Sequence, residues 1–388
     1  MLRKSLISTR SKNHMNATSM AFNGTDEYIL TGFKPEVSAG ASLVMWVKMR
    51  DFTGEQTMGC GSSERFYLGF NGTNIAFGIQ DTSKSSTDVS SYVNVNQWHH
   101  LVLTADGGTA KVYIDGVQRD TASYTEDASS NPVDGFVIGA RNSSDAADER
   151  NQSPMNCLIN EVAIYCKDLT VSDINRIYNN GNGFKHTSED LCAWWRMGDG
   201  HDSQYVIHDG GYMSQGVTPP IWDFGANVAT SGIYNWLKTN VNNGLDNVGN
   251  KYRITYGTSG DKYGASVLLK EDADLTADLN IGHLYKITLT AQRTGIFVGD
   301  AETVIRVKSG HSSNPLSTYA VEGPVTVTEE TRTVYFIAES ETTAELGPAD
   351  IKSADEAIDI DNLAITQYDG YMGLTINIGS GNFVKDSP

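Results

Sequence analysis

The sequence contains no uninterrupted apolar run of the roughly 18 residues that a membrane-spanning helix needs. It is also short of basic residues: 29 lysines and arginines stand against 47 aspartates and glutamates, for a formal net charge of −18 at pH 7. Contacts to nucleic-acid phosphates require a basic surface, so this balance excludes a nucleic-acid-binding protein. Residues 1–12 carry charge but no apolar stretch behind it, and we expect no secretory signal peptide there.

Cysteine is scarce, with four residues in the whole chain. Cys157 and Cys166 lie at the two ends of a predicted strand, and their odd spacing directs them to opposite faces, so they are not expected to bridge each other. Cys60 and Cys192 are isolated in the sequence. We therefore expect reduced thiols, no disulfide and no zinc site, which suits assembly in a cytoplasm.

Motifs for catalysis are missing as well. The eight histidines form no metal-binding motif, and the sequence holds neither a Gly-x-Ser-x-Gly elbow nor a phosphate-binding loop. Asp359 and Asp361 share one face of a predicted strand, and we interpret them as a turn-proximal or calcium-type pair. The sequence therefore predicts a protein that is not an enzyme.

What the sequence does contain favours β structure. Its 38 glycines, 39% hydrophobic residues and weak helical periodicity predict a mostly β protein, and its length predicts two or three domains. Residues 97–120 hold two runs of β-branched and aromatic residues, separated by an Asp-Gly-Gly turn and closed by an Asp-Gly turn. We expect a meander of three strands there, with Leu101 and Leu103 on its core face.

Four stretches in a fixed order carry a family resemblance. They are Ser19-Met20-Ala21-Phe22-Asn23-Gly24, then Ala41-Ser42-Leu43-Val44-Met45-Trp46, then Trp98-His99-His100-Leu101-Val102 with Tyr113-Ile114-Asp115-Gly116, and finally Leu158-Ile159-Asn160-Glu161-Val162 with Asp173-Ile174-Asn175. Together they resemble the opening strand, buried-tryptophan strand, central hairpins and last strand with closing helix of laminin G-like, concanavalin A-like jelly rolls. Such a fold serves lectins, adhesion proteins, hydrolase accessories and viral proteins. Retaining glycosidases of this fold carry carboxylates at Glu-x-Asp-x-x-Glu spacing, which this sequence lacks.

The same resemblance implies one candidate metal site. Asp26, Asn160 and Glu161 occupy positions at which several relatives bind calcium, an ion that takes roughly six to eight oxygen ligands. The alternative is that they are ordinary turn-forming residues. Nothing in the sequence requires a cofactor, and calcium is the candidate.

A near-repeat points to an inserted domain. The sequence His208-Asp209-Gly210-Gly211-Tyr212-Met213 recurs as Tyr368-Asp369-Gly370-Tyr371-Met372, and the residues between form a coherent unit. We predict an all-β fold of two jelly-roll β-sandwiches, the second inserted near the C-terminus of the first. The predicted parts are a basic N-terminal arm at 1–16, a laminin G-like jelly roll with a trailing strand at 17–218, a carbohydrate-binding-module-like sandwich at 219–367, and a tail at 368–388.

Seven short strands with alternating polarity are predicted in the inserted domain. They cover residues 251–256, 264–269, 283–291, 303–308, 324–328, 332–338 and 358–366. The third, sixth and seventh of these resemble strands of carbohydrate-binding-module jelly rolls.

Aromatic residues at the start of the inserted domain are candidates for a glycan site. A sugar has an apolar face and a rim of hydroxyls, so a stacking ring beside polar side chains binds it. Aromatic residues in strands are more often part of the core, which is the alternative. The candidates are Trp222, Tyr234, Trp236, Tyr252 and Tyr256.

Other segments bear on the setting of the protein. Polar connections at 81–88 and 141–150 are expected at the sandwich edges. The adjacent Trp194 and Trp195 should face opposite ways, one to the core and the other to a second domain. Residues 191–200 and the tail 375–388 resemble structural proteins of tailed bacteriophages.

The N-terminal arm is basic on an otherwise acidic chain. We expect it either to contact the acidic surface of a neighbouring subunit or to be a frayed terminus. The candidate assembly contacts are Arg3, Lys4, Arg10 and Lys12.

Together these features predict a bacteriophage virion surface protein, either a capsid decoration or a fibre or tail appendage, assembled in the host cytoplasm and displayed on the virion. It would bind other virion proteins, as a homo-oligomer or in multiple copies on a particle. It would also bind a host surface glycan, with affinity raised by avidity. We expect neither nucleic acid nor a membrane as a partner. The alternatives are a bacterial extracellular glycan-binding or adhesion protein, and a non-catalytic accessory of a polysaccharide-degrading enzyme.

Overall fold

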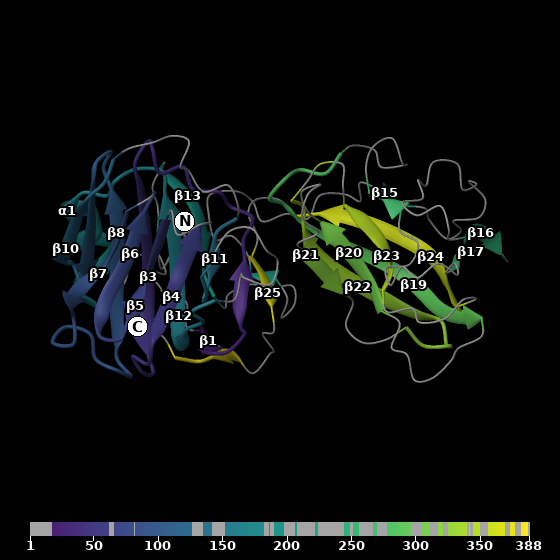
Figure 1. The fold of residues 1–388 in the computed structure, drawn as a ribbon, viewed down its shortest axis with the longest axis horizontal. Helices are drawn as coiled ribbons and strands as arrows, with labels where there is room; N and C mark the ends of the chain where they lie inside the picture. The colour runs from purple at the N-terminus through teal and green to yellow at the C-terminus, as the bar shows by residue number, and fades with distance from the viewer. Residues whose placement is uncertain are drawn as a thin grey trace, which may run out of the picture.

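The computed structural model of the chain is built almost entirely of strands, which form two β-sandwiches side by side along the long axis (Figure 1). This confirms the predicted fold class. The structure describes residues 18–61, 66–80, 82–125, 135–141, 152–181, 186, 190–197, 206–207, 222–223, 244–248, 251–255, 267–269, 278–295, 304–309, 317–320, 325–339, 341, 344–349, 356–368, 373–376 and 382–386.

Two eight-stranded sheets make up the first sandwich. Its strands are β1 (Ser19–Asn23), β2 (Tyr28–Leu30), β3 (Ala41–Met49), β4 (Glu55–Gly61), β5 (Phe66–Asn71), β6 (Asn74–Ile79), β7 (Thr82–Asp88), β8 (Trp98–Ala105), β9 (Thr109–Ile114), β10 (Val117–Ser123), β11 (Val137–Ile138), β12 (Asn156–Tyr165), β13 (Leu191–Trp195), β14 (Val206–Ile207), β25 (Gly373–Ile376) and β26 (Phe383–Val384). Sheet A has the order β10-β9-β8-β3-β12-β1-β26, with β13 also paired to β12, and sheet B has the order β14-β25-β2-β11-β4-β5-β6-β7.

The predicted meander forms the edge of sheet A as β8, β9 and β10. Asp115 and Gly116 turn the chain between β9 and β10 with φ values of 51° and 77°, which a glycine adopts freely and an aspartate tolerates. Leu101 and Leu103 lie in the core between the sheets, as predicted, whereas Val102 packs on the opposite face of sheet A. By contrast, residues 82–88 are strand β7 at the edge of sheet B, so the expectation of a polar loop there is wrong.

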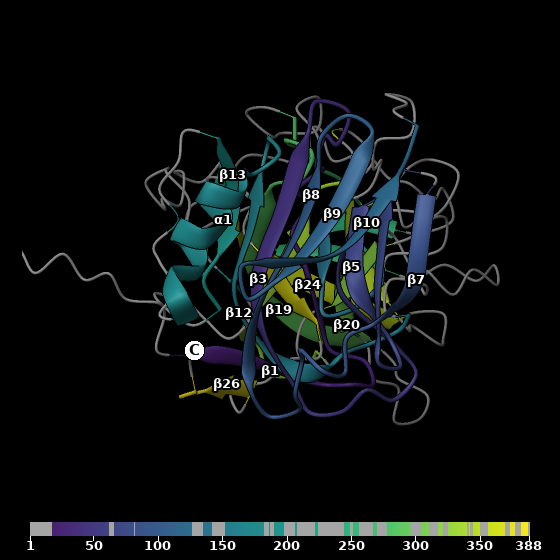
Figure 2. The ribbon, with the colours of Figure 1, turned by 90° about the vertical axis from the view of Figure 1, so that its left-hand side faces the viewer.

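In the part of the chain that the structure describes, one α-helix lies on the outer face of sheet A. Helix α1 (Val171–Tyr178) begins at Thr170, whose hydroxyl accepts a hydrogen bond from the backbone N–H of Asp173 in a capping box, and it is followed by a short 3-10 turn, Asn179–Gly181. Its buried Ile174 and Ile177 pack against the outward side chains of the sheet. Figure 2 shows the helix beside β12 and β13.

The two adjacent tryptophans of β13 face opposite ways, but their surroundings differ in part from the prediction. Trp195 lies in the core, stacked on Phe136 with ring centroids 6.2 Å apart. Trp194 packs on the outer face of sheet A beside His186, with centroids 5.2 Å apart. The expectation that the second tryptophan contacts another domain is therefore wrong, because α1 and the chain around it already cover that face.

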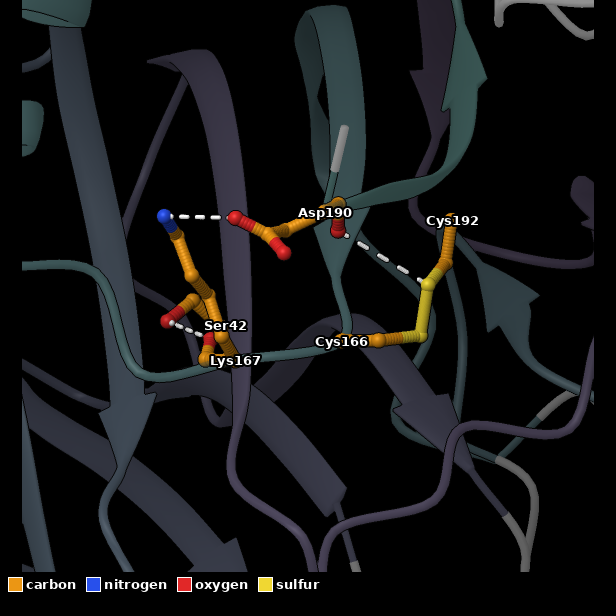
Figure 3. The surroundings of a disulfide bond; sticks show 5 residues. All are labelled: Ser42, Cys166, Lys167, Asp190 and Cys192. Atoms are coloured by element: carbon orange, nitrogen blue, oxygen red, sulfur yellow. Dashed lines mark hydrogen bonds and ion pairs between the residues drawn. A yellow bond between two sulfur atoms is a disulfide. The ribbon is translucent and has the colours of Figure 1, made fainter. Parts of the chain in front are cut away.

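Cys166 and Cys192 form a disulfide, which contradicts the prediction of reduced thiols (Figure 3). Because β13 pairs with β12, the bridge joins two neighbouring strand ends whose Cα atoms are 5.8 Å apart. Next to it Lys167 and Asp190 make an ion pair at 2.7 Å. The end of β12 and the start of β13 are therefore joined by both a disulfide and an ion pair. The sequence hides this pairing because 26 residues separate the two cysteines.

Two smaller sheets make up the second sandwich. Its strands are β15 (Trp222–Asp223), β16 (Gly244–Val248), β17 (Lys251–Thr255), β18 (Val267–Leu268), β19 (Leu284–Gly295), β20 (Val304–Ser309), β21 (Ser317–Ala320), β22 (Glu330–Ile337), β23 (Glu345–Ala349) and β24 (Glu356–Gln367). Sheet C has the order β16-β17-β24-β19-β22 with β15 paired to β24, and sheet D has the order β18-β23-β20-β21. Residues 325–328 lie outside any strand, so the strand predicted there is wrong.

The chain returns to the first sandwich after completing the second. Strand β25 pairs with β2 and β14 in sheet B, and β26 pairs with β1 in sheet A. Asp386, just beyond β26, accepts hydrogen bonds from Lys48 Nζ at 2.7 Å and Trp98 Nε1 at 3.0 Å. These pairings place the second sandwich as an insertion, in agreement with the predicted fold.

An apolar cluster runs across the junction of the two sandwiches. Leu30, Val137 and Leu374 of sheet B belong to the same buried cluster as the core of the second sandwich. The backbones also meet closely, because a Cβ atom at Gly32 would collide with the carbonyl oxygen of Gly282. The outer face of sheet B is thus partly covered by the inserted unit. No helix in the described part of the chain is long and apolar enough to cross a membrane.

Candidate functional site

Most residues predicted to bind glycans or to mediate assembly lie where the structure gives no account of their side chains. Trp222 lies on β15 and Tyr252 on β17, and both strands pair with β24. The other aromatic candidates and the basic arm lie outside the described residues: Tyr234, Trp236, Tyr256, Arg3, Lys4, Arg10 and Lys12. The polar loop at 141–150 also lies outside them, except for Arg141.

The structure does not bring the three predicted calcium ligands together. In the β1–β12 ladder, Asn23 pairs with Asn156 and Met20 with Ile159, so Asp26 lies beyond one end of the pairing. Glu161 lies beyond the other end, and five residues of strand, about 16 Å, separate it from Asn156. Among the described residues no group of three His, Cys, Asp or Glu side chains is placed to hold a metal ion.

Glu161 is instead a buried structural carboxylate. It sits in a β-bulge where two residues of β12 oppose one of β3, and its φ is 50°. The Asn160 side chain accepts a hydrogen bond from the Glu161 N–H at 2.9 Å, and Trp194 Nε1 donates to the Glu161 carboxylate at 2.6 Å. The bulge therefore turns Glu161 toward β13 and fixes Trp194 on the outer face of sheet A.

Two buried histidines lie near Trp194 under the helix. His186 Nδ1 lies 2.7 Å from the Tyr165 hydroxyl, and His100 packs against both Trp46 and Tyr178, with ring centroids 5.1 and 5.7 Å away. Burial lowers the pKa of His100 to about 4, against an opposing effect of Asp115. Burial, together with His100, Arg176 and Arg196, lowers the pKa of His186 to about 3.

This outer-face cluster is neutral at ordinary pH and closed to solvent. Both histidines are almost completely buried, and neither ring nitrogen of His100 has a hydrogen-bond partner among the described residues. Burial raises the pKa of Tyr165 well above its usual range, so its hydroxyl stays protonated. The cluster attaches α1 to sheet A.

His99, the first histidine of the Trp-His-His motif, connects a turn to a loop. His99 Nδ1 lies 2.8 Å from one carboxylate oxygen of Asp115, while the other accepts a hydrogen bond from the His100 N–H at 2.9 Å. On its far side, His99 Nε2 accepts a hydrogen bond from the Asn94 N–H at 3.1 Å. The proton of neutral His99 is therefore on Nδ1, and the ring links the β9–β10 turn to the loop that precedes β8.

That loop, residues 89–97, is held in one shape by its backbone. Val89 and Val93 are buried anchors, and the N–H groups of Tyr92 and Val93 both donate to the Val89 carbonyl, at 2.8 and 2.9 Å. The Asn96 N–H donates to the Met49 carbonyl at 2.6 Å. Between these anchors the loop points outward, so a rigid scaffold presents exposed side chains.

Tyr92 is the most prominent of those side chains, with 41% of its surface exposed. The guanidinium of Arg119 lies over the Tyr92 ring, 3.7 Å from its centroid. Two exposed amides lie on the same loop, and Asn94 Nδ2 donates to Gln97 Oε1 at 3.3 Å. An exposed ring and a guanidinium thus lie together at the edge of sheet A, and two exposed amides follow the ring on the same loop.

Arg119 reaches the ring because of a second β-bulge. In the β9–β10 ladder Gln118 pairs with Tyr113 and Asp120 with Val112, which leaves Arg119 as the extra residue of edge strand β10. A bulge on an edge strand redirects a side chain and ends regular pairing. The adjacent carboxylate of Asp120 is buried and paired with Lys84 on β7.

The chemistry of these side chains is compatible with sugar binding. An aromatic ring packs on the apolar face of a pyranose, while planar amide and guanidinium groups donate and accept hydrogen bonds at the hydroxyl rim. We call Tyr92, Asn94, Gln97 and Arg119 the Tyr92 site.

In the second sandwich, the Asp359 carboxylate is engaged in an ion pair. Arg253 makes a bidentate ion pair with Asp359 at 2.7 and 2.8 Å, and the Asp359 side chain is almost fully buried. Asp361, two residues on, accepts a hydrogen bond from the Asn362 N–H at 2.8 Å. The interpretation of these two aspartates as a calcium-type pair is therefore replaced, for Asp359, by a structural ion pair.

Comparison with known proteins places the first sandwich in a fold class. A laminin G-type family model described as the concanavalin A-like lectin/glucanases superfamily matches residues 23–175. The first sandwich is thus similar, over these residues, to concanavalin A-like jelly rolls. No curated protein sequence matches the chain.

Solved structures similar to this chain include a putative carbohydrate binding protein from Bacteroides ovatus, at 16% identity over 50% of this chain and 55% of that protein, with a TM-score of 0.39. Domain 4 of the Geobacillus stearothermophilus extracellular arabinanase AbnA, in complex with arabinotriose, matches at 24% identity over 41% of this chain and 75% of that domain, with a TM-score of 0.32. The Ruminococcus gnavus sialidase module CBM40, bound to sialyllactose, matches at 14% identity over 41% and 96%, with a TM-score of 0.34. This chain therefore spans about half the length of the Bacteroides protein.

Sequence reasoning missed the Tyr92 site. A tyrosine among Ser90, Ser91 and Asn94, just before the Trp-His-His motif, is a signal of an exposed aromatic in a polar loop. For Arg119 no sequence signal exists, because the bulge that redirects it depends on the register of β9 and β10.

Proposed function

We propose that the protein is a non-catalytic glycan-binding adhesion protein whose sugar site is the Tyr92 site. The observation that carries this proposal is the exposed Tyr92 ring with the Arg119 guanidinium 3.7 Å from its centroid, on a loop held by buried anchors. A fixed aromatic face needs little ordering when a sugar binds, so less of the binding energy is lost.

Two carboxylates that neighbour residues of the Tyr92 site support a binding role rather than hydrolysis. Asp115 is engaged by His99 and by the His100 N–H, and Asp120 by Lys84 and the Thr121 N–H. Glycoside hydrolysis needs two carboxylates facing each other across the scissile bond, one of them free to donate a proton. These two are instead occupied in holding the turn and the edge strand.

A shallow site of this kind binds one sugar weakly, so we propose that the protein acts in several copies. Multiple sites on one particle or one assembly raise the effective affinity by avidity. The partners would be further copies of this chain and neighbouring surface proteins, as the sequence analysis expects, with glycans as the recognised surface.

For the setting, we propose the surface of a bacteriophage virion, which rests on the resemblance of residues 191–200 and of the tail to phage structural proteins. The second candidate is a bacterial extracellular adhesion protein, and the disulfide favours it. Cys166 is exposed, and exposed disulfides persist in oxidising surroundings rather than in a reducing cytoplasm. Electron microscopy of the native source separates the two, since a virion protein appears as symmetric copies on particles.

The proposed function is tested by a glycan array probed with the wild-type protein and with Tyr92→Ala. We expect wild type to bind a subset of glycans and Tyr92→Ala to lose at least about tenfold in signal, because one stacked ring contributes on the order of 1.4 kcal/mol or more. Val327→Ala, which trims an exposed side chain on the second sandwich, is the matched control. Absence of binding by wild type, or equal binding by Tyr92→Ala, would overturn the proposal.

A further inference from the structure

Arg119 has no protein partner for its charge. Apart from the Tyr92 ring, none of the described residues makes an ion pair or hydrogen bond with its guanidinium. Its Nε atom is buried without a hydrogen-bond acceptor, and the side chain as a whole is half-exposed. An arginine fixed in place and left without an acceptor is poised for one from a ligand.

The surrounding surface makes this cation unusual. The chain carries a net charge of −18, and the neighbouring Lys84 is neutralised by Asp120. Lys111, on the adjacent strand β9, is paired with Asp106 at 2.9 Å. Among the described residues at this edge of sheet A, Lys84 and Lys111 are therefore paired with carboxylates, whereas the Arg119 guanidinium is not.

The position of the guanidinium is set by two features of the fold. The bulge in β10 turns Arg119 out of the regular ladder, and stacking on Tyr92 holds the plane of the group against the ring. A guanidinium held in this way offers a planar fork of N–H donors, which matches the two oxygens of a carboxylate. A lysine at the same place would give a point charge without that geometry.

We propose that the Tyr92 site selects glycans that bear a carboxylate, with Arg119 as the specificity-determining residue. This inference rests on the proposed function, because it assigns the sugar class to the same site. The guanidinium covers one face of the Tyr92 ring, so the sugar contacts the part of the ring that stays exposed, and Arg119 pairs with the carboxylate in two parallel hydrogen bonds.

The test uses oligogalacturonate and its fully methyl-esterified form, which share every ring and hydroxyl and differ only at the carboxyl group, charged in the acid and a neutral methyl ester in the other. Binding is measured by calorimetric titration of the full-length protein. We expect wild type to bind the acid at least about tenfold more tightly than the ester, because a charge-assisted bidentate pair contributes roughly 1.5–3 kcal/mol. Arg119→Lys should lose most of this preference and Arg119→Gln all of it.

Controls separate the inference from the proposed function. Lys34→Gln removes one exposed positive charge elsewhere in the first sandwich and should leave the preference unchanged. Equal affinity of wild type for acid and ester overturns the carboxylate selectivity while leaving glycan binding intact. A stronger response to a sulfated oligosaccharide than to the uronate overturns it in favour of a sulfate ligand. No binding of these probes, together with an array on which neutral glycans also fail, overturns both proposals.

Discussion

Asp115 contacts two histidines at once, and through His99 it controls the loop that carries Tyr92. Replacing it with asparagine keeps the shape of the side chain and suits the positive φ at this position. An asparagine amide nitrogen facing His99 Nδ1 would move the proton to Nε2, and the hydrogen bond from Asn94 would be lost.

We therefore predict that Asp115→Asn speeds amide exchange at Asn94 and lowers the free energy of unfolding by about 1–2 kcal/mol. Hydrogen exchange followed by mass spectrometry checks this. Asp106→Asn, at the other turn of the meander, is the control, because Asp106 contacts Lys111 and Thr109 rather than the 89–97 loop. Unchanged exchange at Asn94 in Asp115→Asn would mean that His99 does not hold the loop.

His100 and His186 make stability depend on pH. In the unfolded chain both histidines take up a proton near their ordinary pKa of 6.5, whereas in the folded protein burial delays protonation to about 4 and about 3. The unfolded state therefore binds more protons as the pH falls from about 6.5 to about 4, and stability is lost across that window. Each histidine contributes at most about 1.4 kcal/mol per pH unit.

Urea unfolding at about pH 7, 6 and 5 measures this slope. His100→Phe, which keeps a ring packed against Trp46 and Tyr178, should reduce the slope by the share of one histidine. The same slope in wild type and variant would show that His100 is accessible to protons in the folded state.

Among the elements, α1 and its connections depend on the disulfide. The bridge between Cys166 and Cys192 closes the segment that contains the helix, which otherwise contacts sheet A through a small apolar face. A closed loop of this length stabilises the folded state by about 2–4 kcal/mol, mainly by restricting the unfolded chain.

We predict that Cys166→Ser with Cys192→Ser lowers the melting temperature, and that a reducing agent has the same effect on wild type. The double variant provides its own control, since reductant should not lower its melting temperature further. Cys157 is a buried free thiol, so it does not contribute to the response. A melting temperature of wild type that is insensitive to reductant would contradict the stabilising role of the bridge.

The elements differ in how far the sequence predicts them. The meander and α1 follow from local signals, namely Asp-Gly turns, alternating apolar residues and a Thr-x-x-Asp capping box. The Cys166–Cys192 bridge and the bulge at Arg119 depend on which strands pair and in what register, and these contacts join residues distant in the sequence. For the same reason Asp26 and Glu161 seemed compatible as ligands of one ion until the β1–β12 register separated them.

On the scale of the whole molecule, the two sandwiches share a buried apolar junction. Leu30, Val137 and Leu374 of sheet B are buried in one cluster with side chains of the second sandwich. The strands that flank the insertion, β14 and β25, pair with each other, so the ends of the inserted unit lie close together.

We predict that replacing the inserted residues 219–367 with a short Gly-Ser linker leaves a folded first sandwich that self-associates. Removal of the second sandwich exposes an apolar patch on sheet B, and such patches drive association. Light scattering and circular dichroism check both parts. Leu30→Lys in the shortened chain should reduce this self-association, and an unfolded shortened chain would show that the first sandwich needs its insertion to fold.

The central claim is that glycans bind at the Tyr92 site without being altered. The most direct measurement is an NMR titration of isotope-labelled protein with an oligosaccharide that binds on the array, observing both protein amides and the sugar signals. We predict shifts concentrated in residues 89–97 and at Arg119, with the sugar unchanged over days. Shifts elsewhere on the molecule, or progressive cleavage of the oligosaccharide, would contradict the account.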